Sequence, residues 1–445
     1  RVITSGSADW RPFSWMQNRA TVGVDYTSRK DANILRRGDG PPINTTYRLG
    51  FAQDSRTSIS NLSVDLGSTS TYRPMESIAL RSTVGAQYVN YYIDGSTAFS
   101  EELATGTTTP NSGSVPSATS ATTLSKTLGV FFEEQVAWRD RLFLTGALRT
   151  DQNSAFGTNF QRVVYPKLAA SWIATDEPFF PDLGFVDKLR LRAAYGQSGV
   201  QPGSNDALRS FDGTSASYRG TDVPGVIYDA VGNDKLKPER TAEIEVGFDA
   251  EMFRRTNLEL TYYSKLTKDA LIDAIIAPSA GSGEDEVRKN IGSVKNAGLE
   301  MLFSAQVIDR SAFAADFTIT AAINENKLVT LGQDEGGNPI PPVIGTSTRQ
   351  VGGFPLNGIW ALPINGWNDA NNDGILTANE VIIGTDTIFR GYSTPPYQAC
   401  FVPSVEFLNR SLNIQALFEY KGGNRYYNNT ERILCASRVN WKGRM

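Results

Sequence analysis

The chain has 445 residues and contains no histidine, which excludes a Ser-His-Asp triad, a Cys-His pair and histidine ligation of zinc or haem. Its 43 basic and 47 acidic residues give a net charge of −4, without the basic excess expected of a nucleic-acid-binding protein, so no nucleic acid is expected as a partner. The 40 glycines and 22 phenylalanines, with 17 tyrosines and 7 tryptophans, are typical of an all-β protein with many turns.

Both ends of the chain indicate a piece of a longer protein. The chain opens on Arg1, without the charged and then apolar segments of a signal peptide. It closes on Asn440–Met445, which does not resemble the end of a folded element. No run of 18 apolar residues occurs, so no membrane-spanning helix is expected. Membrane-spanning strands stay open as an option, because their alternation keeps the mean hydropathy low.

Strict alternation of apolar and polar residues is the dominant pattern along the chain. In Thr241–Met252, one set reads Ala, Ile, Val, Phe, Ala, Met, and the other reads Thr, Glu, Glu, Gly, Asp, Glu. The same period of two recurs in 257–262, 299–307, 316–324 and 412–421. It predicts strands with one apolar face. That face would form the core of a soluble sandwich or contact lipid in a membrane barrel, and alternation alone does not decide between them.

The connections between these strands favour the barrel. Short polar turns are expected at 11–18, 72–76, 139–141, 176–187, 254–257, 309–311 and 409–410. Long connections lie between them, at 29–46, 95–122, 152–160, 197–240, 265–296 and 325–394. Within the second of these, the low-complexity stretch Thr105–Thr123 predicts a mobile outer loop. Regular alternation of short and long connections is typical of an outer-membrane barrel, and seven short turns predict about fourteen strands.

Aromatic residues gather beside the short turns, which is the position of an interfacial girdle in a membrane barrel. The alternative is that aromatic residues flank turns in any β protein. The residues concerned are Trp10, Phe13, Trp15, Tyr72, Trp138, Phe143, Phe179, Phe180, Phe185, Phe253, Phe313 and Phe407. We therefore predict an all-β fold, an antiparallel transmembrane β-barrel of the outer-membrane type.

One segment has the spacing of a calcium-binding loop, which places oxygen ligands at positions 1, 3, 5, 7, 9 and 12 with glycine at position 6. Gly374 takes that sixth position. The predicted ligands are Asp369, Asn371, Asp373, the carbonyl of Ile375, Thr377 and Glu380. No helical pattern flanks the segment, so a single structural Ca²⁺ is expected rather than a paired EF-hand domain, and no organic cofactor is expected. The alternative is an Asx- and Gly-rich turn that binds nothing.

The remaining reactive residues do not predict catalysis. Glu243, Glu245 and Glu259 alternate with apolar residues on predicted strands, so we expect them to line a wet lumen rather than to act as acids or bases. No catalytic residue is predicted, and the protein is not expected to be an enzyme. Cys400 and Cys435 are the only cysteines, and they either form one disulfide or stay apart.

Several segments resemble a known family. Leu236-Lys-Pro-Glu-Arg240, the strand 244–248 and the hairpin to Tyr262–Asp269 resemble the barrel of TonB-dependent outer-membrane receptors, and Asn290–Glu300 resembles that family's next strand. Other segments resemble its SusC/RagA branch, namely Leu142–Phe156, Tyr165–Trp172, Leu189–Gly196 and Asp369–Gly374 followed by Tyr420–Asn424. The resemblance extends from Trp10 to Asn429.

The resemblance implies a 22-stranded barrel in the bacterial outer membrane with an N-terminal plug. It further implies import of a large nutrient, a glycan or a peptide, with energy from TonB-ExbB-ExbD and with a SusD-like surface lipoprotein as partner. The sequence departs from this pattern because plug, TonB box and final strands are not recognised in it. We expect a partial barrel of about 14 of the 22 strands over residues 1–430, with long extracellular loops and outer-membrane lipid around it. Residues 431–445 are expected to be an irregular, truncated tail.

Aromatic residues in the long connections are candidates for stacking on sugar rings of a cargo, and the alternative is that they pack within the loops. These residues are Trp360, Trp367, Tyr392 and Tyr397, together with Tyr218 and Tyr228. A second function, a passive channel or structural barrel without TonB coupling, also fits the pattern. An enzyme on a β scaffold is the least favoured, because histidine is absent and no nucleophile elbow occurs.

Overall fold

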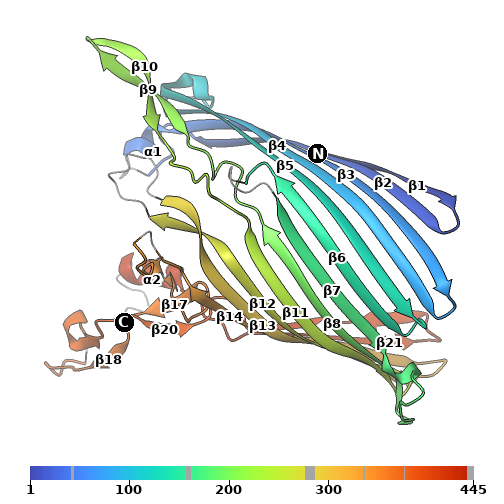
Figure 1. Ribbon diagram of the computed structural model, residues 1–445. Helices are drawn as coiled ribbons and strands as arrows, with labels where there is room; N and C mark the ends of the chain where they lie inside the picture. The colour runs from blue at the N-terminus through green and yellow to red at the C-terminus, as the bar shows by residue number, and fades with distance from the viewer. Residues whose placement is uncertain are drawn as a thin grey trace.

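The computed structural model describes residues 1–41, 45–156, 162–275, 286–333, 336–345, 347–374 and 376–437. Its main element is one curved antiparallel sheet of fifteen strands (Figure 1). Along the sheet these strands follow one another in chain order, except that the last strand pairs with the third from last. They are β1 (Val2–Phe13), β2 (Met16–Leu35), β3 (Phe51–Met75), β4 (Ile78–Leu103), β5 (Gly113–Trp138), β6 (Leu142–Asn153), β7 (Val163–Ile173), β8 (Val186–Val200), β11 (Glu239–Met252), β12 (Thr256–Ile275), β13 (Glu286–Asp309), β14 (Ala314–Thr330), β21 (Tyr397–Phe407), β22 (Leu412–Gln415) and β23 (Phe418–Gly422).

Smaller elements lie in the long connections. The hairpin of β9 (Phe211–Tyr218) and β10 (Thr221–Tyr228) projects from the end of the sheet opposite the short turns (Figure 1). The connection after β14 holds two small sheets, made of β15 (Val343–Ile344), β16 (Thr348–Gln350), β17 (Gly358–Ala361) and β20 (Ile388–Gly391), and of β18 (Ile364–Trp367) and β19 (Val381–Ile383). The α-helices are α1 (Thr45–Leu49) and α2 (Asn429–Ser437). Across the described ranges, no helix has the length and apolar character needed to cross a membrane.

The predicted alternation of short and long connections holds except between β7 and β8. That connection runs from Ile173 to Val186 and is longer than the β4–β5 connection, which was expected to be long. At the other short turns, neighbouring strands pair close to the turn, as in Trp138 opposite Leu142 and Met252 opposite Thr256. At the β5–β6 turn, Arg139 and Asp140 have φ of 52° and 54°. Arg141 N–H donates to the carbonyl of Trp138 at 3.0 Å and closes this turn.

The sheet has one apolar and one polar face, and the apolar face is not covered by other parts of the chain. Leu148 on β6 is 57% exposed and Leu168 on β7 is 62% exposed. The buried apolar residues include many alanines, and the largest fully buried side chains, Leu103, Leu236 and Leu328, lie near the long connections. A soluble sandwich would bury its apolar face, so this arrangement fits a sheet whose apolar face contacts lipid.

The expected loop at Thr105–Thr123 is wrong over most of its length. β5 begins at Gly113 and pairs with β4 through this stretch. Thr122 Oγ1 donates to Asp94 of β4 at 3.2 Å. Threonine favours strands because of its branched Cβ, and hydroxyl side chains pair across strands, so a Ser/Thr-rich composition here extends the sheet instead of ending it.

Two further regions differ from expectation. β12 and β13 extend to Ile275 and from Glu286, well into the connection expected at 265–296. The β9–β10 hairpin lies inside the connection expected at 197–240. Helix α2 occupies part of the tail that was expected to be irregular from residue 431, whereas residues 438–445 lie outside the described part of the chain. Cys400 lies in β21 and Cys435 in α2, and no disulfide joins them.

Because the apolar face is uncovered, an arginine introduced on that face should destabilise the protein in a membrane more than an arginine on the polar face. In the full-length protein, we expect Leu148→Arg to lower the free energy of unfolding from lipid vesicles by about 2–4 kcal/mol, the cost of an arginine near the bilayer midplane. Thr145→Arg places the same side chain on the polar face of the same strand and should cost far less. Urea titration in vesicles measures both, and equal losses would contradict the assignment of the faces.

Candidate functional site

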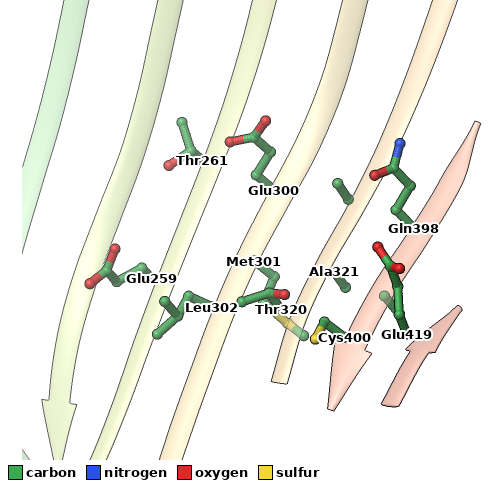
Figure 2. Close-up of a pocket in the computed structure, with 12 residues that line it drawn as sticks. Glu259, Thr261, Glu300, Met301, Leu302, Thr320, Ala321, Gln398, Cys400 and Glu419 are labelled. Atoms are coloured by element: carbon green, nitrogen blue, oxygen red, sulfur yellow. The ribbon is translucent and has the colours of Figure 1, made fainter. Parts of the chain in front are cut away.

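The polar face of the sheet carries charged side chains from many strands. A hollow of about 410 Å³ lies over β12, β13, β14, β21 and β23. The polar residues that line it include Glu259, Thr261, Glu300, Thr320, Gln398 and Glu419 (Figure 2). The strand register brings these residues together from distant parts of the sequence. Thr261 lies opposite Glu300. Cys400 lies between Thr320 on one neighbouring strand and Glu419 on the other.

The hollow is acidic. Glu419 pairs with Lys421 at 2.8 Å, whereas Glu259 and Glu300 form no ion pair with any described residue. Carboxylates without a cationic partner are strong hydrogen-bond acceptors. Chemically, this surface can accept hydrogen bonds from hydroxyl, amide or ammonium groups of a molecule that passes over the sheet.

A cationic row adjoins the hollow. Asp249 of β11 accepts hydrogen bonds from Nε of Arg190 at 2.6 Å and from Nε of Arg192 at 2.8 Å. Arg192 also donates through Nη2 to the hydroxyl of Thr261 at 2.8 Å. The network links β8, β11 and β12 and neutralises part of the arginine charge, so the polar face changes from basic to acidic between β8 and β13.

A second network crosses four strands near the other end of the sheet. Asp65 of β3 accepts from the amide of Gln87 at 2.8 Å. The carbonyl of Gln87 accepts from Arg149 of β6 at 2.9 Å, and Arg149 Nε also donates to Asp151 at 2.9 Å. Arg149 reaches β4 across β5 because Gly129 has no side chain there; a Cβ at Gly129 would collide with the guanidinium of Arg149 and the carboxylate of Asp151.

The three predicted lumen carboxylates lie on strands of the main sheet. Glu243 lies 3.9 Å from the ammonium group of Lys265. Glu245 is opposite Tyr263, and Glu259 is opposite Asp249. Their strands are paired on both sides, so their role is to line the polar face.

The segment 236–240, noted for its resemblance, fastens a long connection to the sheet. Leu236 is fully buried. Lys237 N–H donates to the amide oxygen of Asn290 at 3.0 Å, and the amide of Asn290 donates back to the carbonyl of Lys237 at 2.6 Å. Glu239 accepts from the N–H of Leu271 at 2.7 Å. The segment therefore ties the connection between β8 and β11 to β12 and β13.

The predicted calcium loop is compact. Asp369 accepts from the N–H groups of Asp373 at 3.2 Å and Gly374 at 3.0 Å. Glu380 accepts from both the N–H and the hydroxyl of Thr377 at 2.8 Å, and these bonds hold the pKa of the Glu380 carboxyl below its usual value. Gly374, at φ 76°, makes the turn that a glycine favours at the sixth position.

Two observations leave the calcium site a prediction. Among the described residues, no group of three or more His, Cys, Asp or Glu side chains is gathered closely enough to hold a metal ion. Ile375 lies outside the described residues, so its carbonyl is not placed. The hydrogen bonds of Asp369 and Glu380 also fit the alternative of an Asx-rich turn.

The aromatic candidates separate into two environments. Trp360 and Tyr392 are half-buried in a ring cluster, in which Trp360 lies 4.9 Å from Phe354 and Phe389 lies 6.2 Å from Tyr392. Trp367 is 66% exposed and Tyr397 is 50% exposed. The packing alternative therefore describes Trp360 and Tyr392, whereas Trp367 is exposed in β18. Tyr397 is not in a long connection, because it begins β21 and alternates with Gln398, which places its ring on the apolar face of the sheet, opposite Ile323.

The two further tyrosines lie on the β9–β10 hairpin. Tyr218 is 61% exposed at its tip, and Tyr228 contacts Phe211 at 5.3 Å at its base. The sequence pattern offered no signal for the Arg149 network or for the pairing of Glu259 with Asp249 across strands. Alternation places each residue on the polar face, but register, which alternation does not specify, decides which of them meet.

Comparisons with known proteins agree on one family. The sequence profile described as "TonB dependent receptor-like, beta-barrel" matches residues 3–432. The chain is 27% identical to TonB-dependent receptor P26 of Formosa agariphila, over 66% of this chain and 31% of that protein. It is 26% identical to TonB-dependent receptor SusC of Bacteroides thetaiotaomicron, over 43% of this chain and 20% of that protein.

Solved structures show the same fold. The RagAB peptide importer superposes with a TM-score of 0.77 at 19% identity, over 95% of this chain and 47% of that chain. The chain thus spans about a third of the length of P26 and about half the length of the RagAB chain.

The Arg149 network predicts a specific cost for a side chain on β5. Gly129→Val in the full-length protein should displace Arg149 and lower the free energy of unfolding by about 1–3 kcal/mol, as expected for overpacking and lost charged hydrogen bonds. Gly6→Val in β1, where a Cβ meets nothing within 4 Å, is the matched control. Unfolding in detergent measures both, and equal stability of the two variants would contradict the network.

The calcium prediction is tested on the loop itself. If Ca²⁺ binds, adding it to the full-length protein should slow hydrogen exchange in residues 369–380, and Glu380→Ala should abolish that response because the bidentate ligand is lost. Asp386→Ala, an exposed carboxylate outside the motif, should keep the response. Exchange that is unchanged by Ca²⁺ in the unmodified protein would favour the turn that binds no metal.

Proposed function

The chain belongs to the family of TonB-dependent receptor-like β-barrels, proteins of the bacterial outer membrane, and from this premise we propose that the whole protein imports a large nutrient with energy delivered through TonB. The proposed cargo is a glycan or a peptide. The proposed partner outside the cell is a SusD-like surface lipoprotein, and the energising partner is TonB-ExbB-ExbD. The family is one of receptors and transporters, not enzymes.

The observation that carries the proposal is the polar face. Its hollow offers carboxylates and an amide from four strands and the hydroxyl of Thr320 from a fifth, and Glu259, Glu300 and Gln398 face the same space (Figure 2). Sugars and peptides both present many hydrogen-bond donors, so either cargo would find acceptors along this surface. A surface of separate polar groups binds weakly at each point, which suits passage better than tight retention.

The relatives support the class of cargo but not its identity. The structural relative RagAB is a peptide importer, which supports a peptide. The likeness to SusC of Bacteroides thetaiotaomicron supports the SusC/RagA branch, and with it a partner lipoprotein. We also propose that Asp369–Glu380 binds one structural Ca²⁺ in the connection after β14, on the strength of its ligand spacing.

The outer aromatic residues would meet the cargo first. Trp367 has an exposed ring in the connection after β14, and a ring on a folded loop can stack on a sugar or on an aromatic peptide side chain. Tyr397 lies in β21 on the apolar face of the sheet, so the structure favours its contact with lipid over contact with cargo. Trp360 and Tyr392 belong to the ring cluster and would shape the loop, with contact to the cargo only at their free edges.

Uptake measurements on the full-length protein test the proposal. We expect labelled glycan or peptide mixtures to enter cells only when both the protein and TonB are present. Trp367→Ala should reduce uptake roughly two- to tenfold, as expected for one lost ring contact. Tyr426→Ala, an 84% exposed ring in the segment after β23, is the control and should leave uptake unchanged. Entry that continues without TonB would instead support the passive channel.

A further inference from the structure

Arginines recur at the short turns of the sheet. Five of the seven short turns carry or adjoin an arginine that is exposed and forms no ion pair with any described residue. We call them the turn-edge arginines, and they are Arg11, Arg73, Arg139, Arg255 and Arg310. Arg254 adds a nearly free guanidinium, because it is 91% exposed and lies 3.9 Å from Asp187.

Strand pairing places these arginines along one edge. Met16, next to the first turn, lies opposite Ser70 near the second, and Ile78 lies opposite Trp138 at the third. Later turns align in the same way, as with Thr256 opposite Ala305. The turns therefore form a row at one end of the strands, visible as the lower edge in Figure 1.

Aromatic rings lie in the same row. Phe13 stacks on Trp15 at 5.2 Å, and Phe313 contacts Phe407 at 5.2 Å. The guanidinium of Arg139 lies 4.9 Å from the ring centre of Trp138. Amphipathic rings at one depth mark the boundary between the lipid interior and the headgroups. The arginines next to them are therefore at headgroup level, where lipid phosphate is present at high density. The same turns also carry carboxylates, among them Glu76, Asp140 and Asp309, so phosphate competes with these groups for the guanidinium groups.

We propose that the turn-edge arginines bind the phosphodiester headgroups of anionic phospholipid in the membrane leaflet next to the short turns. Guanidinium groups bind phosphate through paired hydrogen bonds and shed water more readily than ammonium groups. The row of arginines and rings thus sets the depth of the sheet in the membrane. This inference rests on the outer-membrane location of the family and is independent of the cargo.

The test compares unfolding of the full-length protein from vesicles of phosphatidylcholine with and without phosphatidylglycerol. We expect phosphatidylglycerol to slow unfolding of the unmodified protein, and less so at high salt because ions screen the attraction. Arg139→Gly should reduce the factor by which phosphatidylglycerol slows unfolding by about fivefold, which is the contribution of one arginine near an anionic surface. Arg139→Lys should retain most of it.

Two variants serve as controls. Asp140→Gly relaxes the adjacent left-handed residue, φ 54°, and keeps the guanidinium. Arg219→Gly removes an arginine with φ 52° and a ring contact of 5.3 Å to Tyr218, but at the tip of the β9–β10 hairpin, at the far end of the sheet. Arg219→Gly should keep the full response to phosphatidylglycerol, and Asp140→Gly should keep or increase it, because it also removes a negative charge beside Arg139. The proposal is overturned if that lipid has no effect on the unmodified protein, or if Arg139→Gly responds like either control.

Discussion

Peptide groups inside a membrane have no water to bond with, so every strand that crosses it must pair with a neighbour along its length. The chain meets this constraint with a single sheet in which consecutive strands pair over long registers, as in the 26-residue strands β4 and β5. Pairing also decides which side chains share a face. The acidic hollow and the arginine networks are thus products of register, and they need no dedicated loop to position them.

Much of the fold could be predicted because its physical cause is local. The period of two in Thr241–Met252 reports directly on a strand with one apolar face, and it is confirmed as β11. The short turns and the positions of the rings beside them were likewise local patterns. Composition was a weaker guide, since the Ser/Thr-rich residues after Gly113 pair with β4 although they read as a loop.

The candidate site was less predictable because its contacts are distant in sequence. Arg149 hydrogen-bonds to Gln87, 62 residues away, across Gly129 on the intervening strand, which has no side chain in the way. No sequence pattern within β6 indicates that partner. The ring of Trp360 could be read from sequence as a free stacking surface or as packing, and its contacts with Phe354 and Phe389 depend on the fold of the whole connection. Alternation indicated the face on which most strand residues lie, whereas the neighbours of each residue depend on strand register.

The connection after β14 has a small core of its own, built on Phe354, Trp360 and Phe389. It is fastened to the sheet by the bonds of Leu328 N–H to the carbonyl of Phe354 at 2.8 Å and of Leu356 N–H to Asn326 at 2.7 Å. Leu356 and Ile340 also pack on the cluster of Val294, Leu328 and Leu331 at the ends of the strands. The strands therefore fix the base of the connection, while its ring cluster fixes the part that extends beyond them.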